Sequence, residues 1–135
     1  TAESCTGGLL AGRLTELAGA SDFFVGGMTA YADRIKTGVL GVKKSIVGQN
    51  GSVSPETAAA MAERAREVFG SDYSLSVTGI AGPGGGSPDK PVGTVWIGWK
   101  RRGGYARAEM FQFAGDREAV RRQTVEAALK GLESL

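Results

Sequence analysis

The chain has 135 residues, of which 41% are hydrophobic and 22% are charged, and its formal net charge is +2. This balance is typical of one globular domain and excludes a disordered or fibrous chain. No apolar run approaches the ~20 residues that a membrane span needs, and no signal peptide is recognisable, so we expect a cytoplasmic protein. The net charge is small, and the only local cluster of basic residues is RRGG (101–104), so the sequence does not indicate nucleic-acid binding.

The cysteine and histidine counts limit the chemistry. With one cysteine and no histidine, the chain lacks the residues for an intrachain disulfide or for a usual zinc or iron site. No close acidic cluster suggests magnesium, so we expect neither a metal nor a cofactor. The absence of histidine also excludes Ser-His-Asp and Cys-His catalytic arrangements.

The first half of the chain predicts a helix, a strand and a second helix. Leucines at helical spacing follow Gly8 and end at Gly19, which predicts a helix between these glycines. The stretch FFVGGMTAY (23–31) has the apolar and β-branched character of a strand. Asp33 is a suitable cap for a short helix that Gly41 closes.

The second half gives clearer signals. SPETAAAMAERAREVFG (54–70) predicts a helix with Ser54 at its N-cap and a glycine stop. Residues 73–78 alternate as a strand, and 92–100 with 105–113 predict a hairpin around RRGG. A last helix begins at Asp116.

This order predicts a three-layer α/β/α domain over residues 1–135. Strands separated by helices imply parallel crossovers, and the hairpin adds one antiparallel pair, so we expect a mixed, mostly parallel sheet of about five strands. A helix-opening glycine loop such as 4–8 normally follows a strand, and the sequence shows none before it. We therefore expect the first strand to be missing from residues 1–135.

The opening TAESCTGG places small nucleophile-capable side chains directly before a helix. Ser4 there is either a nucleophile, near free backbone N–H groups, or a simple N-cap. Without histidine its base would have to be a lysine, a carboxylate, a tyrosinate or a terminal amine. We interpret Cys5 as a small buried hydrophobe.

Two further segments carry candidate groups. In YADRIK, Tyr31 and Lys36 could meet over a site across a strand-to-helix turn, or be a boundary aromatic and a solvated charge. TGIAGPGGGS (78–87) fits neither a Walker A loop nor the dinucleotide fingerprint, and is an anion-binding loop, a lid or a connector. Arg117 and Arg121 lie four residues apart, so they share a helix face that could bind a phosphate or a carboxylate.

Six motifs in this order resemble the C-terminal domain of the CinA competence/damage-inducible proteins: AESCTGG, Tyr31 with Lys36, GxVS (51–54), TGIAGPGGG, KPVGTV (90–95) and GDRxxVR. That family also occurs alone as nicotinamide-nucleotide amidase. The resemblance implies metal-independent hydrolysis of the carboxamide of nicotinamide mononucleotide, giving nicotinate mononucleotide and ammonia in pyridine-nucleotide recycling. It leaves two alternatives: a non-catalytic nucleotide-binding or assembly domain, or a Ser-Lys amidase for another small amide.

Members of that family carry a leading helix and strand, so the resemblance implies that both are missing from residues 1–135. It also assigns roles to residues. Ser4 would be the nucleophile, Lys36 its base, and Tyr31 and Thr78 supporting hydroxyls that relay or donate a proton to the departing ammonia. Asp33 stands beside Lys36, where a carboxylate favours the charged lysine. The expected substrate-binding residues, which hold the oxyanion or the small-molecule nucleotide, are Thr6, Gly7, Gly8, Asp33, Gly79, Gly82, Gly84, Gly85 and Arg117. The apolar FFVGGM segment and the exposed strand edges make a homodimer the expected assembly.

Overall fold

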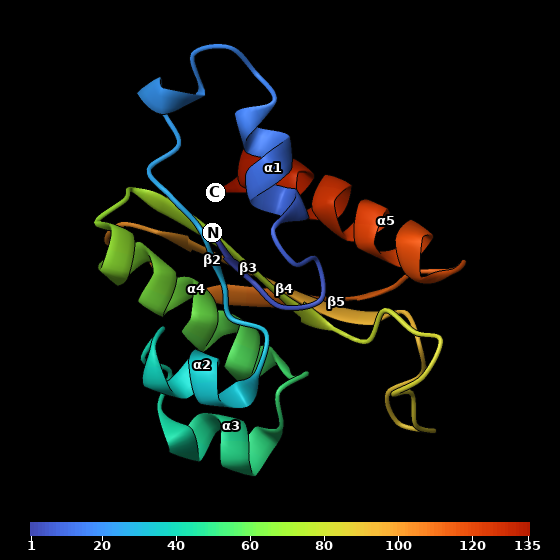
Figure 1. Cartoon of the computed structure of the whole chain (residues 1–135). Helices are drawn as coiled ribbons and strands as arrows, with labels where there is room; N and C mark the ends of the chain where they lie inside the picture. The colour runs from blue at the N-terminus through green and yellow to red at the C-terminus, as the bar shows by residue number, and fades with distance from the viewer.

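A five-stranded sheet divides the molecule into three layers in the computed structural model, which describes residues 1–135 (Figure 1). The strands lie in the order β2-β1-β3-β4-β5, with β1 parallel to both neighbours and the other two pairs antiparallel. Their bounds are β1 Ala2–Glu3, β2 Met28–Thr29, β3 Tyr73–Gly79, β4 Thr94–Arg101 and β5 Arg107–Gln112. The predicted α/β class with a mixed sheet is confirmed.

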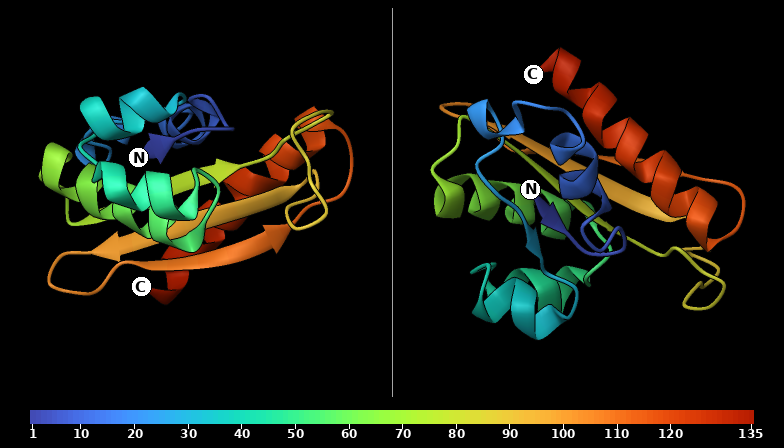
Figure 2. Two further views of the ribbon diagram at one scale, coloured as in Figure 1. Left: turned by 90° about the horizontal axis from the view of Figure 1, so that it is seen from below. Right: turned by 45° about the horizontal axis from the view of Figure 1, so that its top comes forward.

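Helices cover both faces of this sheet (Figures 1 and 2). α1 (Leu9–Thr15) and α5 (Arg117–Lys130) pack on one face, and α4 (Pro55–Phe69) packs on the other. α2 (Asp33–Gly38) and α3 (Lys44–Asn50) lie beyond α4 on that second side, and short 3-10 turns occupy Ala20–Asp22 and Gly131–Ser134. None of the helices is both long and apolar enough to cross a membrane.

Helix α4 begins and ends where the sequence predicts, and α5 begins where it predicts. The Ser54 hydroxyl accepts a hydrogen bond from the Thr57 amide, and Gly70 ends α4 in the left-handed conformation. Asp116 caps α5 in the same way by accepting from the Ala119 amide. These caps are local, so the sequence specifies them.

Two apolar cores follow from the alternation along the strands. One lies between the sheet and α1 with α5, and the other lies between the sheet and α2, α3 and α4. On β3, Leu75 and Val77 enter the first core, whereas Ser74 and Ser76 face α4. Both serine hydroxyls donate to α4 carbonyls at 2.6 Å, so small polar residues let this helix pack close to the sheet.

The strand directions differ from expectation in one respect. β3 and β4 are antiparallel, so the sheet has two antiparallel pairs where one was expected. The glycine loop after β3 contains no helix that could carry the chain across the sheet, and β4 therefore returns beside β3 in the opposite direction.

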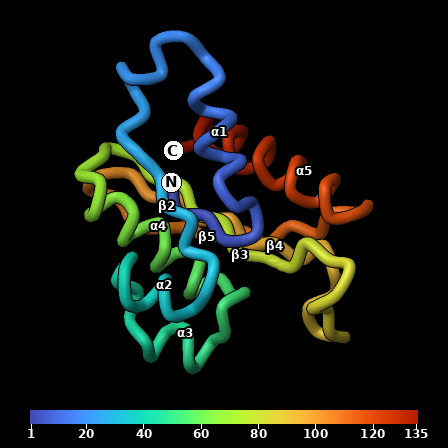
Figure 3. Tube along the Cα trace, in the orientation of Figure 1, coloured from blue at the N-terminus to red at the C-terminus, as the bar shows by residue number.

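The strands nearest the N-terminus correct two expectations. A strand does precede the 4–8 loop, because β1 is hydrogen-bonded between β2 and β3. The strand predicted over 23–31 is reduced to β2, since its only partner, β1, is two residues long. Figure 3 shows the trace at β2 beside the N-terminus of the chain, and the Ala30 amide after β2 donates to the carbonyl of Glu3 in β1 at 2.7 Å.

Three helix predictions also need correction. α1 ends at Thr15 rather than near Gly19, and α3 was not predicted. Ala32, not Asp33, is the N-cap of α2, and no side chain caps that helix. The Asp33 carboxylate instead points towards Lys36 and the segment after α3.

Candidate active site

A cleft opens where β1, β2 and β3 end. The three strands are parallel, so the loops that follow them meet at one edge of the sheet, where α/β proteins commonly bind ligands. The cleft has a volume of about 270 Å³. Its lining comprises Ser4, Cys5, Tyr31, Asp33, Lys36, Ser52, Val53, Thr78, Gly79, Ile80, Ala81, Gly82, Gly84, Gly85 and Arg117.

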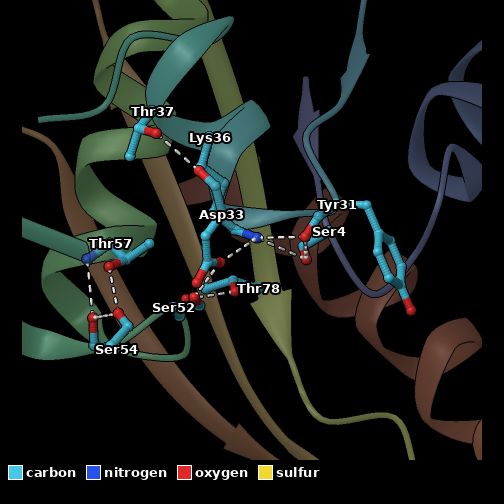
Figure 4. Close-up of polar contacts among 10 residues, drawn as sticks. Ser4, Tyr31, Asp33, Lys36, Thr37, Ser52, Ser54, Thr57 and Thr78 are labelled. Atoms are coloured by element: carbon cyan, nitrogen blue, oxygen red, sulfur yellow. Dashed lines mark hydrogen bonds and ion pairs between the residues drawn. The ribbon is translucent and has the colours of Figure 1, made fainter. Parts of the chain in front are cut away.

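Ser4 and Lys36 are in direct contact within this cleft (Figure 4). Lys36 projects from α2, is only 1% exposed, and its Nζ lies 3.2 Å from Ser4 Oγ. The same nitrogen donates to the Tyr31 carbonyl at 2.8 Å, and Ser4 Oγ lies 3.4 Å from that carbonyl. The backbone of Tyr31 thus holds the lysine against the serine.

Burial and a neighbouring carboxylate have opposite effects on Lys36. Desolvation disfavours the ammonium and lowers the pKa of Lys36 below its ordinary 10.5. The Asp33 carboxylate, with Oδ1 at 3.7 Å from Nζ, works in the other direction, and the net pKa of Lys36 stays lowered. A lowered pKa increases the fraction of neutral amine at a given pH, and the neutral amine is the form that can accept the serine proton.

Cys5 does not compete with Ser4 as a nucleophile. Its thiol is buried in the core that α1 and α5 cover, and burial raises its pKa to about 11. The thiol therefore stays protonated, as expected for a small buried hydrophobe.

A hydrogen-bonded chain connects Asp33 with β3. Ser52 Oγ donates to Asp33 Oδ1, the oxygen that faces Lys36, and the Thr78 hydroxyl donates to the Ser52 carbonyl at 2.7 Å (Figure 4). Ser52 was not among the predicted site residues. The only signal for it is the GxVS motif, in which it is the unspecified position.

The hydroxyls of Tyr31 and Thr78 form hydrogen bonds with protein groups other than Ser4 and Lys36. The Tyr31 ring turns away from Lys36, and its phenol oxygen accepts from Arg117 Nη2 at 3.3 Å (Figure 4). Tyr31 is 56% exposed, and its contact with Lys36 is made by its backbone carbonyl and not by its phenol. Thr78 lines the cleft, and its hydroxyl donates to the Ser52 carbonyl at 2.7 Å.

Glu3, which the sequence reasoning missed, occupies the N-terminus of α1. This carboxylate is 1% exposed and accepts from the Thr6 hydroxyl at 2.6 Å, from the Gly8 and Leu10 amides at 3.0 Å and from the Ala11 amide at 2.8 Å. A negative charge here satisfies the free amides and the helix dipole. No external anion can use this helix terminus.

The loop glycines therefore do not form the expected anion site. Thr6, Gly7 and Gly8 lie outside the cleft lining. The Gly8 amide donates to Glu3 and the Gly7 amide to the Ser4 carbonyl at 3.0 Å. The Cys5 amide donates no hydrogen bond within the protein, and Cys5 lines the cleft, so this amide remains available beside the serine.

The glycine loop and Arg117 do line the cleft, as predicted. Gly82 and Gly85 have φ values of +84° and +86°, in the region that favours glycine. Arg117 Nη1 donates to the Gly82 carbonyl at 2.8 Å and so connects α5 to this loop. Arg121 instead donates to the carbonyls of Cys5 and Thr6, both at 3.1 Å. It therefore stabilises the loop of residues 4–8, which we call the serine loop, rather than forming an open anion site.

No group of three or more His, Cys, Asp or Glu side chains gathers anywhere in the structure. The chemistry of the cleft is instead that of a serine, a buried amine, one carboxylate and a guanidinium. Arg117 is the only arginine that lines the cleft, and its guanidinium can bind an anionic group of a ligand.

Comparisons with known proteins identify the family of this chain. The profile of the CinA C-terminal domain matches residues 1–135. The chain belongs to the CinA C-terminal domain family. A CinA-like protein of Akkermansia muciniphila is 52% identical over 132 residues, which are 98% of this chain and 32% of that protein. The chain thus spans about a third of the length of such CinA-like relatives.

Relatives of nearly the same length as this chain also exist in the CinA family. The nicotinamide-nucleotide amidohydrolase PncC of Pseudomonas putida is 50% identical over 135 residues, covering all of this chain and 84% of that protein. Among solved structures, the competence/damage-inducible protein CihA of Agrobacterium tumefaciens is similar with a TM-score of 0.95 and 42% identity, over 98% of this chain and 81% of that one. The predicted family resemblance is confirmed.

Proposed function

We propose that this chain is an amidohydrolase that cleaves the carboxamide of nicotinamide mononucleotide, releasing nicotinate mononucleotide and ammonia, with Ser4 as nucleophile and Lys36 as its base. The observation that carries the proposal is the contact between the buried Lys36 amine and Ser4 Oγ at 3.2 Å, at the floor of a ligand-sized cleft. The 50% identity to a nicotinamide-nucleotide amidohydrolase over the whole chain supports the substrate class.

Acylation begins with neutral Lys36. Its lone pair accepts the Ser4 proton while Oγ attacks the carboxamide carbon, and the carbonyl π electrons move onto oxygen. The free amide of Cys5, the residue after the nucleophile, is the donor best placed to stabilise that oxyanion. The new ammonium of Lys36 is stabilised by the Tyr31 carbonyl and by Asp33.

The same lysine completes both halves of the reaction. It returns the proton to the amide nitrogen as the carbon–nitrogen bond breaks, so ammonia leaves and a nicotinoyl ester of Ser4 remains. Neutral Lys36 then takes a proton from water, the resulting hydroxide attacks the ester, and Ser4 recovers its proton from the lysine. No second titratable group is needed, which fits the absence of histidine.

The anionic end of the substrate is assigned to the cationic side of the cleft. Arg117 and the glycine loop (Gly79, Gly82, Gly84 and Gly85) are the proposed contacts for the phosphate, because Glu3 occupies the N-terminus of α1. Asp33 is proposed to act near the reacting end, since its carboxylate lies beside Lys36.

The proposal also places the protein in cytoplasmic pyridine-nucleotide recycling, as a homodimer. Exposed apolar side chains next to edge strand β2, Phe23 and Val25, support self-association. Light scattering on the purified protein measures the oligomeric state, and a monomer at micromolar concentration would contradict this part.

The deciding experiment follows ammonia release from nicotinamide mononucleotide. Ser4→Ala and Lys36→Ala should each lower kcat by about 10³-fold or more. Lys43→Ala, which removes an exposed lysine outside the cleft, is the matched control and should leave the rate unchanged. Binding of the nucleotide without ammonia release would favour the alternative of a non-catalytic binding domain. Faster turnover of nicotinamide itself would favour the alternative of an amidase whose substrate is another small amide.

A further inference from the structure

Ser52 lies next to the lysine but has no part in the proposed proton transfers. We infer that Ser52 is a positioning residue that holds the Asp33 carboxylate away from Lys36, so that the lysine stays free to serve Ser4. This inference rests on the proposed function and deepens it, because it identifies what keeps an acid from inactivating the base beside it.

The first step of the argument is the geometry around the lysine nitrogen. Lys36 Nζ lies 2.8 Å from the Tyr31 carbonyl and 3.2 Å from Ser4 Oγ, whereas Asp33 Oδ1 is at 3.7 Å, beyond hydrogen-bond length. The closest polar partners of the amine are thus the uncharged ones. The acid that could form a tight ion pair stands back from it.

The second step is what keeps that carboxylate in place. Asp33 precedes Lys36 by three residues on α2, a spacing at which opposite charges normally attract. Its side chain is 61% exposed, so no packing fixes it. The hydrogen bond from Ser52 Oγ goes to Oδ1, the oxygen nearest the lysine, and both orients the carboxylate and withdraws charge from that oxygen.

The third step is that Ser52 is itself held rigidly. The carbonyl of Gly51 accepts from the Ser54 hydroxyl at 3.0 Å and from the Thr57 hydroxyl at 2.7 Å. The carbonyl of Ser52 accepts from Thr78 at 2.7 Å. The backbone on both sides of the Ser52 side chain is therefore anchored, to α4 and to β3, and the hydroxyl has a fixed origin from which to bind Asp33 (Figure 4).

The other charged and titratable groups near Lys36 do not substitute for this arrangement. The Cys5 thiol stays protonated, and the Tyr31 phenol points to Arg117. Arg117 is engaged with that phenol and with the glycine loop. Asp33 is the one acid whose position governs how readily the lysine loses its proton.

The test is the pH dependence of kcat/KM for ammonia release. Ser52→Ala should move the ascending limb to higher pH by about half a unit or more, because the freed carboxylate closes on the ammonium, and should lower the rate about threefold at pH values below the limb. Ser52→Thr keeps the hydroxyl and should restore the profile. Asp33→Asn should move the limb about one unit lower, since it removes the neighbouring charge.

Two controls make the inference refutable. Ser71→Ala, the same substitution away from the cleft, should leave the profile unchanged. In an Asp33→Asn background, Ser52→Ala should cause no shift, because no carboxylate remains to be held. An unmoved limb in the single Ser52→Ala variant, or an equal upward shift in the double variant, would overturn the inference.

A readout without substrate separates this inference from the proposed function. Titration of the Lys36 side chain by carbon-detected NMR of lysine-labelled protein should show a higher pKa in Ser52→Ala than in the parent protein. If the parent protein releases no ammonia, the proposed function fails, and the NMR titration still decides the role of Ser52. If ammonia is released but the lysine titrates identically in both proteins, only the role of Ser52 is refuted.

Discussion

Replacing Glu3 by alanine should destabilise the fold more than any other removal of an acidic side chain. The carboxylate accepts four hydrogen bonds, two of them fully buried, from the Thr6 hydroxyl and the Leu10 amide. Leaving a buried donor unpaired costs about 1–3 kcal/mol, and losing a helix cap costs about 1 kcal/mol. Because the variant no longer buries a charge, part of this loss is offset, and we expect the free energy of unfolding to fall by about 3 kcal/mol.

Urea denaturation of the parent protein and of the variants measures this quantity. Glu3→Gln keeps one acceptor oxygen but aims an NH₂ group at an amide donor, so an intermediate loss of about 2 kcal/mol is expected. Glu16→Ala at the end of α1 removes an acid that is 63% exposed and should change stability by less than about 0.5 kcal/mol. A Glu3→Ala loss below about 1 kcal/mol would refute the view that this carboxylate holds the serine loop against α1.

Three further predictions concern the cleft and the packing of the sheet. Burial lowers the pKa of Lys36, so kcat/KM should rise with pH through a pKa below the ordinary 10.5. The unfolded chain then binds more protons than the folded one, so the free energy of unfolding should also rise with pH up to 10.5 in the parent protein but not in Lys36→Met. Arg117→Ala should raise KM about tenfold with a smaller change in kcat, since it frees both the glycine loop and the Tyr31 phenol. A fall in kcat as large as the rise in KM would contradict this prediction. A Cβ on Gly98 would lie 2.5 Å from the α4 backbone, so Gly98→Ala should lower the free energy of unfolding, measured by urea denaturation, by more than about 2 kcal/mol. A Cβ on Gly12 in α1 would meet nothing within 4 Å, so Gly12→Ala should raise that free energy by about 0.5–1 kcal/mol.

The elements with complete local signals were predictable from the sequence. α4 and α5 have an N-cap side chain, an apolar face and a stop within about fifteen residues, and the hairpin has its turn between two alternating runs. α3 and the two-residue strands β1 and β2 lack such signals. Their residues form elements only because neighbouring segments offer backbone partners.

The contact between Ser4 and Lys36 was accessible from the sequence in two steps. A chain without histidine leaves only a lysine, a carboxylate, a tyrosinate or a terminal amine as a base for a serine, and the family resemblance then indicated Lys36. The structure places its amine against Ser4, as that reasoning required. Residue types and their absence are properties of the sequence alone, so elimination works before any coordinate is known.

Tertiary structure alone decided which atoms of the site residues meet. Tyr31 offers its carbonyl to the lysine and its phenol to Arg117, Glu3 takes the amides that were expected to bind an anion, and Ser52 restrains Asp33. The contact of the Tyr31 phenol with Arg117 and that of Ser52 with Asp33 join residues 86 and 19 positions apart in the sequence. Side-chain direction depends on how those segments pack against one another, and local sequence patterns do not encode that packing.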